Sequence, residues 1–377
     1  MAVEHKQVFR GRHVANRLLT GTGSGKITRH HEISLEGAPV QYLPGDALGL
    51  HPINDPGLVD AVLAAIGAAG DETVEAPDGT SCTIREALAT QDLNTPTRRL
   101  IEFYASRGVT EFDTLLERGH AERLKQYVGA KDEAHDVLDV ITSHPEVAIT
   151  PAELMGTLRR NLPRLYSVAS SQKMHPGEVH LLVVSVRYTI RGRERLGVCS
   201  TWIADRFPVG GTADMYLQNQ QKHFAMPADP STPMIMIGPG TGLAPFRAFL
   251  EERLATGAGG RNWLFFGEQH RASEFFYEDE LTAWQRDGFL RLDLAFSRDQ
   301  AEKIYVQHRM REHARDIWAW LEEGAELFVC GDKERMAADV DRELLRIVQT
   351  AGGRTEDQAR EYVGRLRKTK RYKRDVY

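Results

Sequence analysis

The order of hydrophobic and polar residues divides the chain into stretches with different hydrophobic periodicity. Short apolar segments bounded by turn residues predict strands at residues 13–20, 30–35 and 47–51. From about residue 55 to 160, apolar residues recur at helical spacing instead. Three N-cap and proline pairs mark expected helix starts there: Asp55-Pro56, Thr95-Pro96 and Thr150-Pro151. Strand texture then returns at residues 165–169, 179–188 and 212–217, so the simplest account is one antiparallel β-barrel interrupted by a helical insertion.

After a Pro/Ala-rich linker at residues 226–233, strands alternate strictly with helices. The expected strands are 234–238, 263–267, 290–296 and 326–331. Such alternation predicts a doubly wound parallel sheet with helices on both faces and ligands at the carboxyl ends of its strands. The chain is expected to close with a basic helix from residue 365 and a frayed end at 375–377.

The sequence therefore predicts an α/β multidomain protein. The expected parts are a β-barrel at 1–54 and 160–228, a helical insertion at 55–159, and an α/β domain at 229–377.

The clearest chemical signal is the glycine-rich turn GPGTGLAPFR, residues 238–247, which follows a strand and opens a helix. Gly240, Thr241 and Gly242 would let the backbone approach a pyrophosphate at the helix N-terminus. By itself the turn is equally compatible with a tight strand–helix connection, and its position after the first parallel strand favours a nucleotide site.

Two further groups follow strands of the same sheet. Ser297, Arg298, Lys303, Tyr305 and Gln307 supply a hydroxyl, two cations, an aromatic face and an amide, a set that suits the 2′-phosphate of NADP(H). Taken alone, this segment would be a solvated loop. Cys330 and Asp332 end the next strand; a buried cysteine there is more often a core residue, but it is also placed to lie beside a reacting ring.

In the barrel half, 164–167 and 197–201 carry groups that suit a flavin nucleotide. Arg164 can pair with a phosphate, Tyr166 can lie on an aromatic ring and Ser167 can bond a ring nitrogen. Tyr188 can stack on an adenine. The second turn, expected to open a helix at 202–206, is suited to a phosphate and consists of Gly197, Val198, Cys199, Ser200 and Thr201. Without the second half of the chain, these would be ordinary barrel residues.

Composition excludes several classes. The formal net charge of −5 argues against a protein whose whole surface binds nucleic acid. The three cysteines are too few for a disulfide framework, and no apolar run is long enough to span a membrane, so we expect a cytoplasmic protein. Segment 21–26, GTGSGK, lacks P-loop spacing and is not expected to bind nucleotide. The histidines lack ligand spacing, so no metal is predicted.

These motifs, in order, resemble the ferredoxin–NADP⁺ reductase-type FAD/NADPH module of the diflavin reductases, most closely the flavoprotein subunits of assimilatory NADPH–sulfite reductases. The resemblance implies FAD binding by Arg164, Tyr166, Ser167, Tyr188, 197–201 and Tyr377. It implies NADPH binding by Gly240, Thr241, Gly242, Ser297, Arg298, Lys303, Tyr305, Gln307, Cys330 and Asp332. It also implies a hydride-transfer set of Ser167, Cys330 and Asp375, with Tyr377 covering the flavin until nicotinamide displaces it.

The resemblance implies a reductase that moves hydride from NADPH to FAD. Residues 1–12 are too few for the FMN domain that precedes this module in the diflavin proteins. We therefore expect a separate electron acceptor: a flavodoxin, a ferredoxin or a sulfite reductase hemoprotein. One alternative is a general ferredoxin– or flavodoxin–NADP⁺ reductase. Another is a non-catalytic flavoprotein docking subunit.

Overall fold

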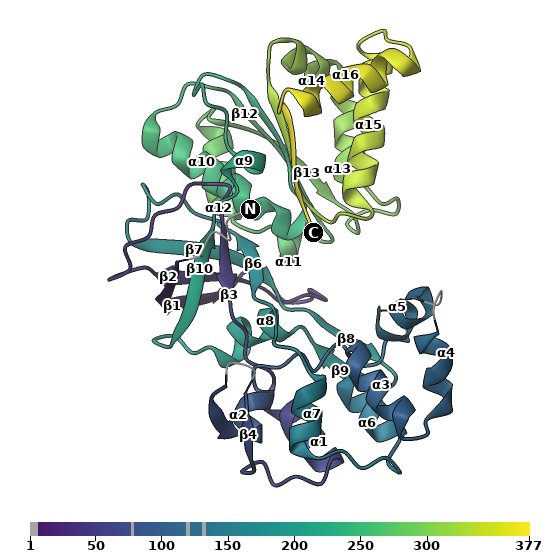
Figure 1. Ribbon diagram of the computed structural model, residues 1–377. Helices are drawn as coiled ribbons and strands as arrows, with labels where there is room; N and C mark the ends of the chain where they lie inside the picture. The colour runs from purple at the N-terminus through teal and green to yellow at the C-terminus, as the bar shows by residue number, and fades with distance from the viewer. Residues whose placement is uncertain (1–6, 77–78, 118–120, 130–132) are drawn as a thin grey trace. The chain divides into compact units, whose positions relative to one another are not determined.

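The computed structural model describes residues 7–76, 79–117, 121–129 and 133–377, which form two compact units (Figure 1). Unit 1 contains the chain up to Gly49 together with Leu165–Ser185 and Pro208–Tyr377. Unit 2 contains Leu50–Arg164 and Val186–Phe207. The three-part division expected from the sequence stays a prediction. Among the described residues, no helix is both long and apolar enough to cross a membrane.

The first sheet of the fold is antiparallel and six-stranded, in the order β6-β3-β10-β1-β2-β7. Its strands are β1 (Val8–Leu18), β2 (Thr28–Ser34), β3 (Ala47–Leu50), β6 (Arg164–Ser167), β7 (Glu178–Val184) and β10 (Thr212–Gln218). Directly after β6, Val168 forms an antiparallel bridge with Leu181 of β7. This bridge joins the two edges of the sheet, as the predicted barrel requires.

The second sheet of unit 1 has five parallel strands in the order β13-β12-β11-β14-β15. They are β11 (Met234–Ile237), β12 (Asn262–Glu268), β13 (Leu290–Phe296), β14 (Glu326–Gly331) and β15 (Tyr372–Val376). The accompanying helices are α9 (Gln221–Phe224), η3 (Gly240–Leu243), α10 (Ala244–Thr256), α11 (Arg271–Glu274), α12 (Glu278–Arg286), α13 (Val306–Glu312), α14 (Ala314–Glu322), α15 (Met336–Thr350) and α16 (Glu356–Lys368).

Side-chain alternation along the central strand β11 explains why helices cover both faces of this sheet. Ile235 and Ile237 pack in a core with α13, α14, α15 and α16, whereas Met234 and Met236 pack in another core with α10 and α12. Figure 1 shows the two helical layers on opposite sides of the sheet. The predicted α/β fold is confirmed, and it brings the carboxyl ends of all five strands to one edge.

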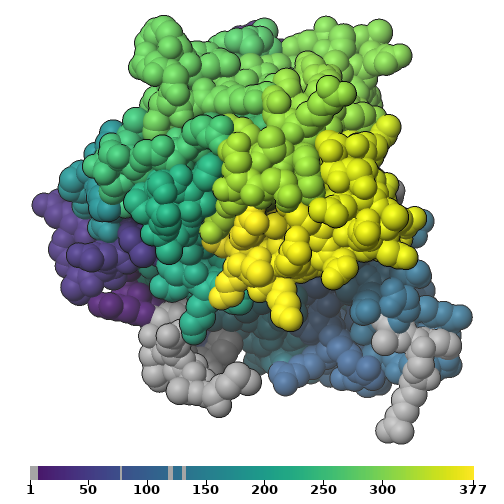
Figure 2. Space-filling model, turned by 90° about the horizontal axis from the view of Figure 1, so that it is seen from above, coloured from purple at the N-terminus to yellow at the C-terminus, as the bar shows by residue number. Residues whose placement is uncertain are grey.

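The C-terminus differs from its prediction. The basic helix α16 ends at Lys368, and Tyr372–Val376 then form a fifth parallel strand beside β14 rather than a frayed end. Two ion pairs anchor the strand, Lys373 to Glu326 at 2.6 Å and Arg374 to Asp341 at 2.9 Å. The residues coloured yellow in Figure 2 include this strand. Asp375 and Tyr377 are therefore held by a sheet.

Unit 2 is mainly helical. Its helices are α1 (Pro56–Ala65), α2 (Ile84–Leu88), α3 (Arg98–Ser106), η1 (Thr110–Phe112), α4 (Asp113–Leu116), α5 (Ala121–Gly129), α6 (Val137–Ser143), α7 (Pro151–Thr157), α8 (Val198–Thr201) and η2 (Trp202–Arg206). Two hairpins complete it, formed by β4 (Thr73–Glu75) with β5 (Ser81–Thr83) and by β8 (Arg187–Ile190) with β9 (Arg193–Leu196).

Three sequence-derived boundaries need correction. Thr97 rather than Thr95 caps α3, because its side chain accepts from the backbone of Leu100. The expected strand at 179–188 divides into β7 and β8, since the chain passes from unit 1 to unit 2 between them. The second phosphate-type turn opens a helix at Val198, four residues before the start expected at 202.

Candidate active site

Three side chains from distant segments meet at the carboxyl edge of the parallel sheet. Ser167, at the end of β6, donates a hydrogen bond of 2.7 Å to Asp375 Oδ2. Cys330, on β14, lies opposite Asp375 in the β14–β15 pairing, and its Sγ is 3.9 Å from the same carboxylate oxygen. The structure thus brings together Ser167, Cys330 and Asp375, the three residues implied for hydride transfer.

The protonation of this cluster follows from its burial. Cys330 is fully buried, and burial together with the neighbouring Asp375 carboxylate raises the pKa of its thiol well above the ordinary value. Burial also raises the pKa of Asp375, an effect that the hydrogen bonds from Ser167 and Cys330 oppose. The cluster therefore pairs a neutral thiol with a carboxylate whose charge depends on its two hydrogen-bond donors.

Tyr377 is held beside the glycine-rich turn. Its amide donates to Gly331, its carbonyl accepts from Lys333, and its hydroxyl lies 2.9 Å from the hydroxyl of Thr241. The side chain is nevertheless 64% exposed. The backbone of Tyr377 is therefore fixed at the edge of the sheet, while its ring lies exposed beside Thr241.

Gly242 explains why the turn needs glycine. A Cβ at this position would lie 2.1 Å from the carbonyl oxygen of Cys330. The turn therefore packs directly against β14, and any side chain at residue 242 would force the two segments apart. This contact fixes Thr241 and Cys330 in one neighbourhood.

A pocket of about 450 Å³ opens at the same sheet edge, in unit 1. It is lined by seven of the ten residues implied for NADPH (Gly240, Ser297, Arg298, Lys303, Tyr305, Gln307 and Asp332), whereas Thr241, Gly242 and Cys330 are not among its lining residues. Asp332 also caps α15, because its carboxylate accepts from the backbone of Arg335 and Met336. Gln307 donates to Asp339 at 3.0 Å.

Two cations that line the pocket lack an acidic partner in the described ranges of the chain. Within residues 7–76, 79–117, 121–129 and 133–377, the side chains of Arg298 and Lys303 have no hydrogen-bond or ion-pair partner. Both side chains are exposed, and Tyr305, 42% exposed, lies near them along the chain. Two free cations with an aromatic face fit a phosphate attached to a nucleoside.

Sequence reasoning missed Lys26, which also lines this pocket. Lys26 Nζ lies 2.7 Å from Glu268 Oε2, and Ser24 of the same loop donates to Glu274 at 2.6 Å. A Cβ on Gly240 would lie 3.3 Å from Glu268 Oε1, so the Lys26–Glu268 pair stands beside the glycine-rich turn. The segment 21–26 lacks P-loop spacing, and only its position in space reveals its lysine.

Of the remaining residues implied for FAD, Tyr166 lies on β6 in unit 1, whereas Arg164, Tyr188 and residues 197–201 lie in unit 2. Arg164 is exposed, and so is Tyr188 of β8, at 45%. In the part of the chain that the structure describes, no side chain caps the start of α8 at Gly197. A Cβ on Gly197 would lie 2.7 Å from Ser200 Oγ and 2.8 Å from Val186 Cβ, so the turn requires glycine. Cys199 is buried behind the turn.

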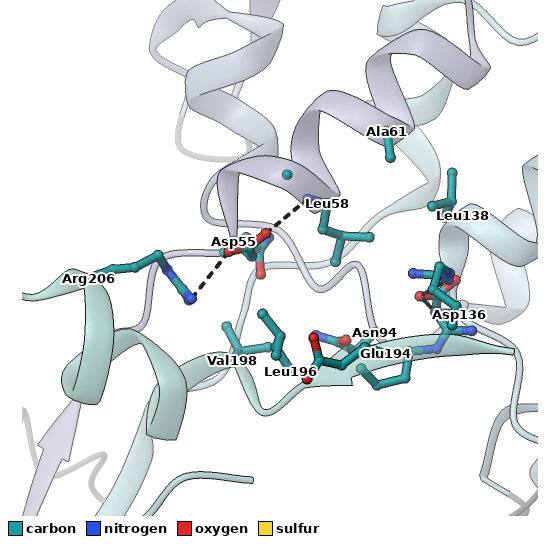
Figure 3. Close-up of a pocket in the computed structure, with 14 residues that line it drawn as sticks. Asp55, Leu58, Ala61, Asn94, Asp136, Leu138, Glu194, Leu196, Val198 and Arg206 are labelled. Atoms are coloured by element: carbon teal, nitrogen blue, oxygen red, sulfur yellow. Dashed lines mark hydrogen bonds and ion pairs between the residues drawn. The ribbon is translucent and has the colours of Figure 1, made fainter. Parts of the chain in front are cut away.

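A second pocket, of about 240 Å³, lies within unit 2 between α1, α6 and β9 (Figure 3). Asp55 accepts from the Leu58 amide and pairs with Arg206 at 3.3 Å. Asp136 likewise pairs with Arg193 at 2.6 Å and with Arg195. Because these cations are compensated by carboxylates, this pocket is a weaker anion site than the one around Arg298.

Comparison with known proteins assigns the class. Residues 1–202 match the FAD binding domain family and residues 236–342 match the oxidoreductase NAD-binding domain. The first match covers more than half of the 377 residues, and the chain belongs to the FAD binding domain family. The expected order, with an FAD-binding half followed by a nicotinamide-dinucleotide-binding half, is confirmed.

The individual relatives are more specific. The chain is 43% identical over 373 residues to the sulfite reductase [NADPH] flavoprotein alpha-component of Bacillus subtilis, covering 98% of this chain and 61% of that protein. The proteins of the same name from Photorhabdus laumondii and Aliivibrio fischeri are 45% and 42% identical, covering 95% and 97% of this chain and 59% of each relative. The chain thus spans about 60% of the length of these relatives. The resemblance drawn from the motifs is confirmed.

Proposed function

We propose that this chain is an FAD-containing reductase that takes hydride from NADPH and passes the electrons to a separate acceptor protein in sulfite reduction. The carrying observation is the meeting of Ser167, Cys330 and Asp375 at the carboxyl edge of the parallel sheet, next to a pocket with free cations. Hydride transfer needs positioning and electrostatics rather than a nucleophile, and this cluster supplies both.

The flavin, when bound, supplies a ring that accepts the hydride of NADPH with its two electrons. In this proposal the Asp375 carboxylate stabilises the positive charge that develops on the nicotinamide. Ser167 holds the carboxylate by its 2.7 Å hydrogen bond, which opposes the rise that burial causes in the pKa of Asp375. Cys330, a neutral buried thiol, excludes water from the reacting region.

We assign FAD binding to Arg164, Tyr166, Ser167, Tyr188, Gly197, Val198, Cys199, Ser200, Thr201 and Tyr377. The fit is chemical. The exposed Arg164 suits a phosphate, and the Tyr188 ring is free to stack. The backbone amides at the uncapped start of α8 suit the pyrophosphate.

We assign NADPH binding to Gly240, Thr241, Gly242, Ser297, Arg298, Lys303, Tyr305, Gln307, Cys330 and Asp332, and we add Lys26. Arg298 and Lys303 would bind the 2′-phosphate, whose charge they match. Lys26, beside the glycine-rich turn, would bind the phosphates that NADPH and NADH share. Selectivity for NADPH over NADH would therefore depend on Arg298 and Lys303, at the 2′-phosphate end of the pocket, and not on Lys26.

The proposed acceptor is supported by the names of the relatives, in which "alpha-component" implies a second component. We propose a sulfite reductase hemoprotein as that component. A flavodoxin or ferredoxin would make the protein a general NADP⁺ reductase instead. A purely docking subunit is disfavoured because Ser167, Cys330 and Asp375 form the contacts that hydride transfer requires.

The test is turnover with defined acceptors. The purified chain, reconstituted with FAD, is assayed for NADPH oxidation with ferricyanide, then with a sulfite reductase hemoprotein and sulfite, and with flavodoxin or ferredoxin. We expect the chain to reduce ferricyanide with NADPH, and Asp375→Asn to lower that rate. We also expect sulfite-dependent oxidation of NADPH only when the hemoprotein is present. Activity with flavodoxin but not hemoprotein would establish the general reductase, and no ferricyanide reduction by an FAD-loaded chain would overturn the enzyme assignment.

A further inference from the structure

Histidines and glutamates gather on one face of the barrel, where β2 pairs with β7. His30 and Glu32 occupy alternate positions on β2, and Glu178 and His180 occupy alternate positions on β7. The antiparallel register sets Glu32 directly opposite His180. Residues two apart on a strand point to the same face, so a His-x-Glu pair faces a Glu-x-His pair across the two strands.

The donor atoms lie close enough to share one ion. One nitrogen or oxygen each from His30, Glu32 and His180 lie within 4.8 Å of one another, and the same holds for His175, Glu178 and His180. His30 Nε2 is 3.2 Å from Glu32, and His180 Nε2 is 3.4 Å from Glu178. Zinc bonds of about 2.0–2.2 Å require ligand atoms within roughly 4.4 Å of one another, so small side-chain rotations complete the site.

The two imidazoles of the cluster lie inside the protein. His30 and His180 are only 2% and 3% exposed. His180 Nδ1 is buried and has no hydrogen-bond partner among the described residues. A buried nitrogen lone pair without a donor is costly, and a metal ion would satisfy it.

His30 is oriented from both sides. Its Nδ1 lies 2.8 Å from the hydroxyl of Tyr277, and its Nε2 lies 3.2 Å from Glu32 Oε1. The buried cation Arg247 opposes binding through its charge, but it is compensated by Glu251 at 2.7 Å and Glu280 at 2.8 Å. The side chains of Glu32, His175 and Glu178 are 28–39% exposed, which gives an ion access from solvent.

We propose that this cluster, at the β2–β7 face, binds one divalent metal ion of the zinc class, with His30, Glu32 and His180 as its protein ligands. Imidazole nitrogen combined with carboxylate oxygen is a donor set typical of zinc. The ion would tie β2 and β7 together, a structural role separate from the reductase chemistry. Linear motifs gave no indication of the site, because its ligands come from two strands that are far apart in the sequence.

The direct test is metal content. The FAD-loaded protein is stripped with a chelator, incubated with excess Zn²⁺, dialysed and analysed for zinc by mass spectrometry. The wild type should retain about one zinc per chain and His180→Gln essentially none, while His223→Gln, at an exposed histidine outside the cluster, should retain the wild-type amount. Zinc should also raise the thermal midpoint of the wild type by several degrees and leave that of His180→Gln unchanged.

A rim variant guards against loss of the fold. Glu32→Gln changes a ligand whose side chain is 32% exposed, and it should weaken zinc retention at least tenfold with an unchanged circular dichroism spectrum. Wild-type protein without zinc after dialysis would overturn the proposal. Equal zinc in the wild type and in folded His180→Gln would overturn it too. Neither result depends on NADPH oxidation, so the reductase assignment is tested separately.

Discussion

The hydroxyl of Ser167 donates a 2.7 Å hydrogen bond to the carboxylate of Asp375, although 208 residues separate the two in the chain. Ser167 ends a strand of the barrel, and Asp375 lies on the last strand of the parallel sheet. Their contact joins the two sheets of unit 1 at the place where hydride transfer is proposed. The hydrogen bond from Ser167 also lowers the pKa of Asp375, against the rise that burial causes.

The first prediction concerns the pH dependence of flavin reduction. The Ser167 hydrogen bond lowers the pKa of Asp375 against the effect of burial, so Ser167→Ala should raise that pKa further. If the ionised carboxylate is needed, the rate falls as pH drops through this pKa, and the fall should begin at higher pH in Ser167→Ala. Stopped-flow reduction by NADPH across pH 5–9 measures it. Asp375→Asn should abolish this fall in rate at low pH and slow flavin reduction roughly 100-fold. A pH dependence that is unchanged in both variants would exclude Asp375 as the titrating group.

The Cys330 thiol should resist alkylation. Burial and the Asp375 carboxylate raise its pKa well above the ordinary value, so little thiolate exists even at pH 9. Iodoacetamide labelling followed by peptide mass spectrometry should modify the partly exposed Cys82 at least ~100-fold faster than Cys330 between pH 7 and 9. Comparable labelling rates would show that Cys330 is neither buried nor protonated as described.

Cofactor selectivity should depend on Arg298 and Lys303. Replacing both by Ala removes two charge-assisted contacts that only the 2′-phosphate can make, so kcat/KM for NADPH should fall roughly 100-fold and that for NADH should change little. Arg346→Ala, at an exposed arginine of α15 outside the pocket, is the matched control and should leave both values unchanged. Equal losses with the two cofactors would refute the 2′-phosphate assignment.

Lys26 should affect both cofactors alike. Lys26→Ala leaves the Glu268 carboxylate, whose side chain is 5% exposed, unpaired beside the glycine-rich turn, where it would repel phosphate. KM should rise about tenfold or more for NADPH and NADH together. Adding Glu268→Gln removes the repelling charge and should recover part of the loss. A selective loss for NADPH would instead assign Lys26 to the 2′-phosphate.

Tyr377 should hinder the reaction with NADH more than the reaction with NADPH. Its exposed ring is held by one hydroxyl contact to Thr241, and displacing it takes binding energy that NADH supplies less well. Tyr377→Ala should raise kcat/KM for NADH on the order of tenfold. Tyr377→Phe keeps the ring and loses only the Thr241 contact, so its gain should be smaller. An unchanged NADPH/NADH ratio in Tyr377→Ala would argue against the lid.

Local patterns predicted what depends on local chemistry. The glycine-rich turn, the loop with Arg298 and Lys303, and the alternation of strands and helices are each encoded within a dozen residues, and the structure has them where expected. The family resemblance then supplied the grouping of Ser167, Cys330 and Asp375, which no spacing reveals, and the structure adds the hydrogen bond between Ser167 and Asp375. The comparisons support the class, and the individual residue roles await the experiments above.

The features that the sequence did not reveal share one physical cause: each depends on contacts with residues that are far away in the chain. Residues 372–376 are rich in charge and read as the end of a basic helix, yet β14 offers them an open edge, and Glu326 and Asp341 neutralise Lys373 and Arg374. Lys26 lies in a loop with no motif, and it reaches the pocket because Glu274 and Glu268 hold that loop through Ser24 and Lys26. The histidine cluster likewise exists only in the β2–β7 register.

The most direct test of the central claim is an anaerobic absorbance titration of the FAD-loaded chain with NADPH and, separately, with NADH. Hydride transfer from NADPH predicts loss of the oxidised flavin band near one equivalent of NADPH, with NADH needing a large excess. A chain that holds FAD and keeps its oxidised spectrum in excess NADPH would contradict the account.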